Sequence, residues 1–289
     1  MRQWHPLFAY FLRQVLEGRY EVLTNFAVGD VPREADVVVL KRSALRGPQF
    51  RHLWKWLTHW NILEFKGPTV RPREAHLDLL LELGLGVARR LNDQRVRDKL
   101  RPLPPRQISW WYVVRELPRS LKKKWERRVG RLSQVETGLW RGAVVGYPLY
   151  LLSSVETPLD DETLPLHLLG ARRPQEEAAL ARYVLGHAEA YCHYAPWMFA
   201  LHTRIWKKEQ AVSGKVIDDN LEIDWTPVVE EFGLDLLIRQ VGLARVVEEV
   251  GLVRVIEEVG LARVIEEVGV DKLLDSLTPE QLAKLKSRL

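Results

Sequence analysis

Short apolar segments bounded by glycine, proline and charged residues restrict the folds open to the N-terminal half of the chain. Three of them, at 21–29, 34–42 and 61–66, follow a helical segment at 5–17 and predict successive short strands. Successive short strands favour an antiparallel meander, and a later crossover helix allows a fourth strand to lie beside it. The leucine-rich segment that follows provides this helix. We therefore predict an α/β (α+β) fold.

The remaining elements of this half are placed by the same criteria. The leucine-rich helix is expected at 72–99 and the fourth strand at 108–117. A tryptophan-rich segment, FRHLWKWLTHW at 50–60, is expected to form one short helix. The basic segment LKKKWERR, at 121–128, predicts another helix, and one or two further strands are expected within 138–154. Helix is expected again from Pro174 to about Lys208.

Glycine recurs every nine residues near the C-terminus, in units such as GLARVVEEV and GLARVIEEV, and six units span 224–277. Each unit carries apolar residues at i, i+3, i+4 and i+7, the spacing of one helical face. Nine residues advance a helix by about 900°, so one straight helix would place successive stripes on opposite sides. Each glycine can instead end a two-turn helix. We predict a compact helical solenoid; the alternative is one long helix buried between partner chains.

These patterns divide the chain into four parts. They are an α/β domain at 1–155, a helical extension at 156–222, the nine-residue repeats at 224–277 and a capping helix at 278–289. Thr278 and Pro279 fit the start of that last helix.

Composition excludes several classes of protein. A single cysteine, Cys192, rules out an internal disulfide and a cysteine-based zinc site. No apolar run approaches the length of a membrane span, and the N-terminus lacks the pattern of a signal peptide. We therefore expect a soluble cytoplasmic protein that does not insert into a membrane.

Charge is distributed unevenly along the chain. Residues 1–150 carry 28 Lys and Arg against 14 Asp and Glu, whereas residues 211–289 carry 9 against 16. A basic domain beside an acidic tail indicates that the first half meets a polyanion such as nucleic acid, although ordinary surface charge is the alternative. The acidic repeats could serve self-association as a homo-oligomer, or could mask the basic domain.

Two charged residues interrupt the apolar strand NILEFK. Ile62, Glu64 and Lys66 share one face of this strand, and Asp36 lies on the preceding one. If the two strands pair, Asp36 and Glu64 can converge and bind a hard cation such as Mg²⁺ or Mn²⁺. Lys66 could then orient or activate the attacking water and stabilise charge on a phosphate. A purely structural ion network of the same residues is the alternative.

Asp36 followed by Glu64 and Lys66, set in this order of elements, resembles the PD-(D/E)XK nuclease superfamily. Within this superfamily, the motifs and the order of elements over about residues 5–117 most resemble the recombination-promoting nuclease/putative transposase group. The resemblance implies a restriction-endonuclease-like core and a Mg²⁺-dependent DNA nuclease, with Asp36 and Glu64 as metal ligands and Lys66 as a catalytic residue. It also implies a further acid on the first helix, for which Glu17 is the best candidate. The alternative is a catalytically inactive nuclease fold that acts as a nucleic-acid-binding or self-associating scaffold.

Basic residues in two segments are candidates for DNA phosphate contacts. They are Arg51, Lys55, Lys122, Lys123, Lys124, Arg127 and Arg128. Trp54, Trp56 and Trp60 accompany the first segment, where they could stack on bases or, as is more usual, pack in the core. His76 and Asp78, early in the leucine-rich helix, are expected to be polar groups of the helix surface.

Overall fold

The computed structural model describes residues 4–24, 27–28, 33–34, 37–43 and 50–214. The nine-residue repeats, the C-terminal segment and Asp36 lie outside the described residues, so the expectations for them stay predictions. The chain divides into two compact units between residues 176 and 177, about twenty residues after the domain end expected from the sequence.

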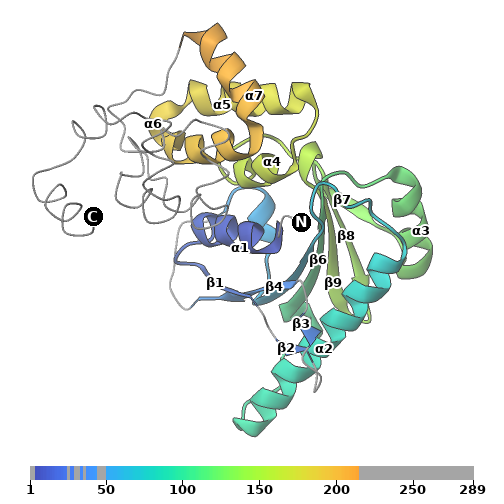
Figure 1. Ribbon diagram of the computed structural model, residues 1–289. Helices are drawn as coiled ribbons and strands as arrows, with labels where there is room; N and C mark the ends of the chain where they lie inside the picture. The colour runs from blue at the N-terminus through green and yellow to red at the C-terminus, as the bar shows by residue number, and fades with distance from the viewer. Residues whose placement is uncertain (1–3, 25–26, 29–32, 35–36, 44–49, 215–289) are drawn as a thin grey trace, which may run out of the picture. The chain divides into compact units, whose positions relative to one another are not determined.

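A seven-stranded mixed sheet organises the first unit (Figure 1), with strand order β1-β4-β5-β6-β9-β8-β7. The strands are β1 (Tyr20–Leu23), β4 (Val37–Arg42), β5 (Trp60–Phe65), β6 (Ile108–Val114), β7 (Ser133–Glu136), β8 (Leu139–Val144) and β9 (Tyr147–Ser153). A separate pair, β2 (Ala27–Val28) and β3 (Arg33–Glu34), lies between β1 and β4 in the sequence. This mixed architecture confirms the α/β class.

The strand pairing follows from the length of each connection. β1, β4 and β5 form the expected antiparallel meander. β6 returns after a long helix and pairs parallel with β5, as a crossover connection requires. β9 pairs parallel with the other side of β6, and the hairpins to β8 and β7 extend the sheet antiparallel. β6 is therefore central, and all seven of its residues are buried.

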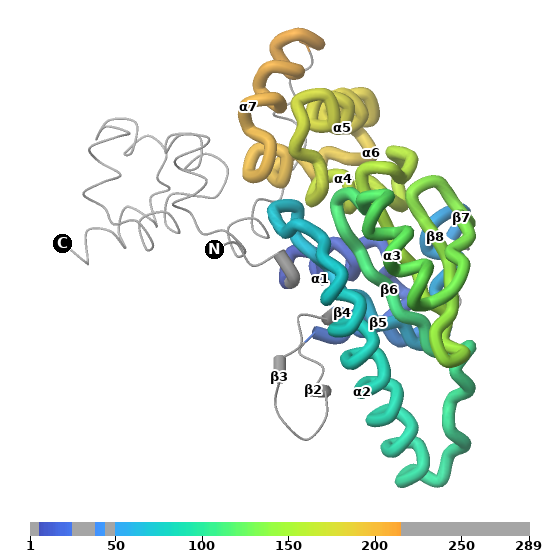
Figure 2. The backbone as a smooth tube through the Cα atoms, turned by 90° about the vertical axis from the view of Figure 1, so that its right-hand side faces the viewer, coloured from blue at the N-terminus to red at the C-terminus, as the bar shows by residue number. Residues whose placement is uncertain are grey.

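Helices cover both faces of this sheet (Figures 1 and 2). α1 (Trp4–Val15) lies on one face, where Phe8 stacks on Phe65 of β5 with ring centroids 4.4 Å apart. α2 (Ala75–Arg97) and α3 (Arg119–Val129) cover the other face. Their core includes Ile62, Trp110 and Trp125, all fully buried. Residues that alternate along β5 thus point into two different cores.

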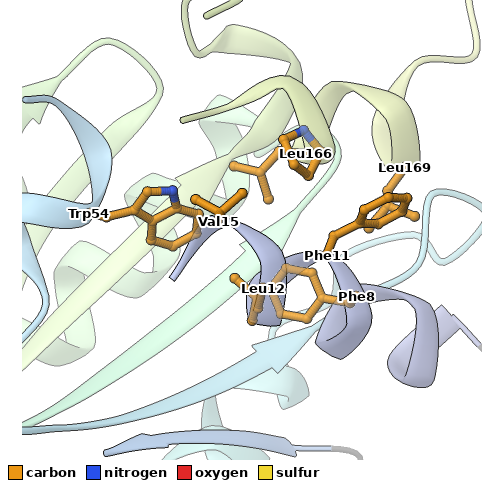
Figure 3. A pocket seen from close by; sticks show the side chains of 8 residues that line it. Phe8, Phe11, Leu12, Val15, Trp54, Leu166 and Leu169 are labelled. Carbon is orange, nitrogen blue, oxygen red and sulfur yellow. The ribbon is translucent and has the colours of Figure 1, made fainter. Parts of the chain in front are cut away.

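A small apolar cavity of about 10 Å³ lies between α1 and α4 (Leu164–Gly170) and is drawn in Figure 3. Its lining consists of Phe8, Phe11, Leu12, Val15, Trp54, Pro165, Leu166 and Leu169. A space of this size holds at most about one water molecule, and these side chains offer it no convergent polar groups. The cavity is a gap in packing and not a ligand site.

The tryptophan-rich segment does not form the single helix expected for it. A 3-10 turn, η1 (Leu53–Trp56), is its only helical part. Glu162 explains the irregular path, because its carboxylate accepts hydrogen bonds from the backbone N–H of Arg51 (2.6 Å) and of His52 (3.2 Å). The indole N–H of Trp54 donates to the Glu162 carbonyl at 2.8 Å. Trp54 is 2% exposed and therefore belongs to the core, which excludes base stacking by this residue.

The described part of the second unit is helical, and its first helix begins in the last residues of the first unit. Its helical elements are α5 (Pro174–Gly186), α6 (Ala188–Tyr191), the 3-10 turn η4 (Cys192–Tyr194) and α7 (Ala195–Ser213). α7 bends at His202, where the backbone leaves helical geometry and the ring Nδ1 lies 3.0 Å from Glu177 Oε1. Two further 3-10 turns, η2 (Pro105–Gln107) and η3 (Ser154–Glu156), lie in the first unit. Within the described ranges, no helix combines the length and the apolar character needed to cross a bilayer.

Gly84 allows α2 to approach the sheet at Trp110. A Cβ at this position would stand 2.6–2.7 Å from three indole atoms of Trp110. We expect Gly84→Ala to lower the free energy of unfolding by about 1–3 kcal/mol, because overpacking outweighs the roughly 1 kcal/mol of helix preference that alanine adds. Urea unfolding measures the change. Gly186→Ala in α5 is the control, since its Cβ would meet no atom within 4 Å. Equal stability of the two variants would contradict this packing.

Candidate functional site

Glu64 occupies a buried position near the end of β5. Its residue is 1% exposed, and its side chain points to the α2 face together with Ile62. Lys66 follows directly after the strand, and its backbone N–H still donates to Val113 at 2.8 Å, which continues the ladder. The Lys66 ammonium therefore emerges on the same face and forms an ion pair with Glu64. With 14% of its side chain exposed, Lys66 also reaches the surface.

Tyr112 of β6 is the nearest neighbour of Glu64 across the parallel pair, since the two residues are register partners. Its ring is fully buried. Burial, and then the negative charge of Glu64, raise the pKa of Tyr112 well above its usual range. The phenol therefore stays protonated at neutral pH.

His76, in the first turn of α2, completes this group. Its Nδ1 lies 2.7 Å from the Tyr112 hydroxyl and also accepts the backbone N–H of Arg73 at 3.2 Å. Because Nδ1 accepts, the proton of the neutral ring is on Nε2. Burial, followed by the positive charges of Lys66 and Arg73, lowers the pKa of His76, so the ring is neutral near pH 7. His76 was expected to be a polar group of the helix surface; it is half-buried and is also bonded to Tyr112.

Tyr112 and His76 are the site residues that the sequence analysis missed. Tyr112 shares a face of its strand with Trp110 and Val114, but only the register between β5 and β6 places it beside Glu64. A histidine ten residues after Lys66 and at the start of a helix is a weak signal by itself. Asp78, by contrast, lies on the helix surface as expected, where it pairs with Arg128.

The metal site expected at Asp36 and Glu64 is described only in part. Asp36 lies outside the described residues; β4 begins at the next residue, Val37, which is the register partner of Glu64. The described ranges contain no group of three His, Cys, Asp or Glu side chains arranged to hold an ion. Glu64 supplies the oxygen chemistry that Mg²⁺ prefers, and its buried position at a strand end fits a ligand that shares such an ion with a second carboxylate.

The structure does not bring Glu17 to this group. α1 ends at Val15, and Glu17 follows in an exposed turn. The chain then enters β1 beside the far end of β4, where the Ser43 N–H donates to the Arg19 carbonyl at 2.7 Å. β4 is six residues long, so its two ends are roughly 16 Å apart, and Glu64 pairs at the opposite end. Glu17 was predicted because the helix seemed to continue to residue 17.

The basic residues of α3 differ in their partners. Lys124 pairs with Glu74 at 3.1 Å, Arg128 pairs with Asp78, and Lys122 lies over the Trp140 ring at 4.9 Å. Glu74 and Asp78 flank the start of α2, so these pairs hold α3 beside the helix that carries His76. Two further basic residues, Lys123 and Arg127, are exposed and form no ion pair within the described part of the chain.

The basic residues of the tryptophan-rich segment are less available. Lys55 pairs with Glu136 of β7 at 2.5 Å, and this hydrogen bond lowers the pKa of Glu136. Arg51 is exposed, and its backbone is held by Glu162. Of the two clusters expected to meet DNA, α3 therefore retains more uncompensated charge.

Comparisons with protein-family models, with curated proteins and with solved structures found no match for this chain.

A substitution cycle on stability tests the ion pair in the buried site. Lys66→Met is expected to lower the free energy of unfolding by about 3 kcal/mol, because it removes the cation that faces the buried Glu64 carboxylate. Glu64→Gln in the same chain should recover most of this loss, since the buried charge is then absent. Chemical unfolding of the four proteins at pH 7 measures the coupling. Additive effects of the two substitutions would contradict the pair.

Proposed function

We propose that this protein is a metal-dependent phosphodiesterase that cleaves DNA at a site formed by Asp36, Glu64 and Lys66. The observation that carries the proposal is the buried Glu64 carboxylate paired with Lys66 at the end of a central strand. Burying two charges costs desolvation free energy, and an apolar pair of similar volume is often at least as stable. Buried charged groups are frequent in functional sites.

The order of elements around the site supports the same proposal. α1, the meander β1-β4-β5, the crossover helix α2 and the parallel strand β6 follow the order of the PD-(D/E)XK nuclease core. We assign a restriction-endonuclease-like core on this basis. Fold similarity alone does not define an activity, so the assignment depends on the side chains of the site.

Glu64, with Asp36, would hold Mg²⁺ or Mn²⁺. The bound ion would polarise the scissile phosphate and promote ionisation of the attacking water. Lys66 would hold that water and offset the negative charge that develops on the phosphate. Before substrate binds, Glu64 keeps the Lys66 ammonium in the site. Glu17 has no part in this mechanism, because the chain places it at the other end of β4.

The second candidate function is DNA binding without cleavage, on the same fold. Exposed Lys123 and Arg127 on α3 favour it, as does the excess of basic residues over 1–150. Assembly through the repeats and a cytoplasmic location remain predictions from the sequence, and both candidate functions are compatible with them.

Plasmid nicking decides between the two candidates. In Mg²⁺ or Mn²⁺ the wild-type protein should convert supercoiled DNA to nicked or linear forms, and EDTA should stop it. Lys66→Ala should lower the cleavage rate by about 10²–10³, the loss typical of removing one group that stabilises transition-state charge. Lys208→Ala, an exposed lysine of α7, is the control and should cleave normally. Equal cleavage by the Lys66 variant and wild type would reject the assignment of the site.

DNA affinity in EDTA tests the role of α3. Substituting Lys123 and Arg127 by alanine should weaken binding to all sequences and lower the slope of log K against log salt by about 2, one for each lost phosphate contact. The control replaces Arg204 and Lys208 of α7, which are also exposed, basic and four residues apart. An equal loss of affinity in both double variants would show that only net charge matters.

A further inference from the structure

His76 has one ring nitrogen whose chemistry the proposed site does not yet use. Nδ1 is occupied, because it accepts from the Arg73 backbone and faces the Tyr112 hydroxyl. The remaining nitrogen, Nε2, carries the proton of the neutral ring and forms no hydrogen bond within the described part of the chain. The ring is half-buried, so part of it is open to a bound molecule.

The surroundings of the ring define what that molecule would be. The positive charges of Lys66 and Arg73 are near enough to affect the proton affinity of His76. His76 is also the second residue of the 23-residue helix α2. The N–H groups of His76 and Leu77 already donate to the carbonyls of Arg73 and Glu74, so the helix start contributes only its partial positive charge. Lysine, arginine and a ring N–H at a helix start together suit an anion, and the anion of the proposed reaction is a phosphate.

We propose that His76 is a catalytic residue of the proposed phosphodiesterase, whose Nε2–H donates a hydrogen bond to a non-bridging oxygen of the scissile phosphate beside Lys66. This inference rests on the proposed function. Because Nδ1 accepts and the neutral ring carries its proton on Nε2, His76 acts on the phosphate as a hydrogen-bond donor. Its hydrogen bond strengthens as charge builds on the phosphate, which favours the transition state.

Tyr112 is a positioning residue in this arrangement. Its hydroxyl donates to Nδ1 from a ring that is fully buried beside Glu64, so both the tautomer and the orientation of His76 are fixed by the sheet. A donor whose position is set before substrate binds loses little free energy to reorientation during the reaction. The pairing thus connects the core of β6 directly to the surface group that would contact the phosphate.

Two substitutions of His76 separate a chemical role from a structural one. Glutamine can place an N–H near the position of Nε2, whereas asparagine can replace Nδ1 as the acceptor for Tyr112 but reaches no further. We expect His76→Asn to lower kcat in the Mg²⁺ plasmid assay about 100-fold, and His76→Gln to retain more than about a tenth of wild-type kcat. KM should change less than kcat in both variants, because the contact forms mainly in the transition state.

The opposite ranking, with asparagine active and glutamine inactive, would overturn the proposal, since it would mean that His76 serves only to hold Tyr112. Equal losses in the two variants would also overturn it. Urea unfolding checks that each variant is folded. If either is not, imidazole added to His76→Ala decides the question: restored cleavage supports a chemical role, and an unchanged rate rejects it.

The outcomes also separate this inference from the proposed function. If wild type cleaves, Lys66→Ala does not, and His76→Asn cleaves at the wild-type rate, only the role of His76 is rejected. If wild type fails to cleave DNA with Mg²⁺ or Mn²⁺, the proposed function is rejected and the role of His76 with it.

Discussion

The parallel pairing of β6 with both β5 and β9 is the constraint on which the rest of the structure depends. It buries all seven residues of β6, so Trp110 must pack against α2 and α3 while Trp111 must pack on the opposite face, where it stacks on Tyr150 at 4.3 Å. The same register places Tyr112 beside Glu64. The central strand β6, which is buried on both faces, therefore places the Tyr112 phenol beside the buried Glu64 carboxylate of β5.

The Glu64 carboxylate is paired with a cation and lies beside two side chains that can form hydrogen bonds. Lys66 forms an ion pair with Glu64, and Tyr112, whose hydroxyl is bonded to His76, is the register partner of Glu64. The ion pairs of Lys124 and Arg128 fix α3 against the start of α2. A basic helix is thereby held beside the helix that carries His76.

The α/β class and the meander could be predicted because each depends on local pattern and on connection length, both of which can be read from the sequence. The tryptophan-rich segment could not, because its path depends on Glu162, more than 100 residues away in the sequence. Glu64 and Lys66 could be found from their alternation in one strand. Tyr112 and His76 could not, since their positions depend on the register of β6 and the docking of α2. The position of Glu17 could not be predicted, because it depends on the end of α1 leading into β1 beside the end of β4 that is opposite Glu64.

Anomalous diffraction from crystals soaked in Mn²⁺ tests the central claim, that Glu64 is a metal ligand, most directly. The account predicts a peak in direct coordination with the Glu64 carboxylate and with the Asp36 carboxylate, close to Lys66, and predicts that it is lost in Glu64→Gln. A peak of full strength in that variant, or well-ordered Glu64 and Lys66 side chains still paired with no peak beside them in the wild type, would contradict it. In that case the pair would be a structural ion pair only.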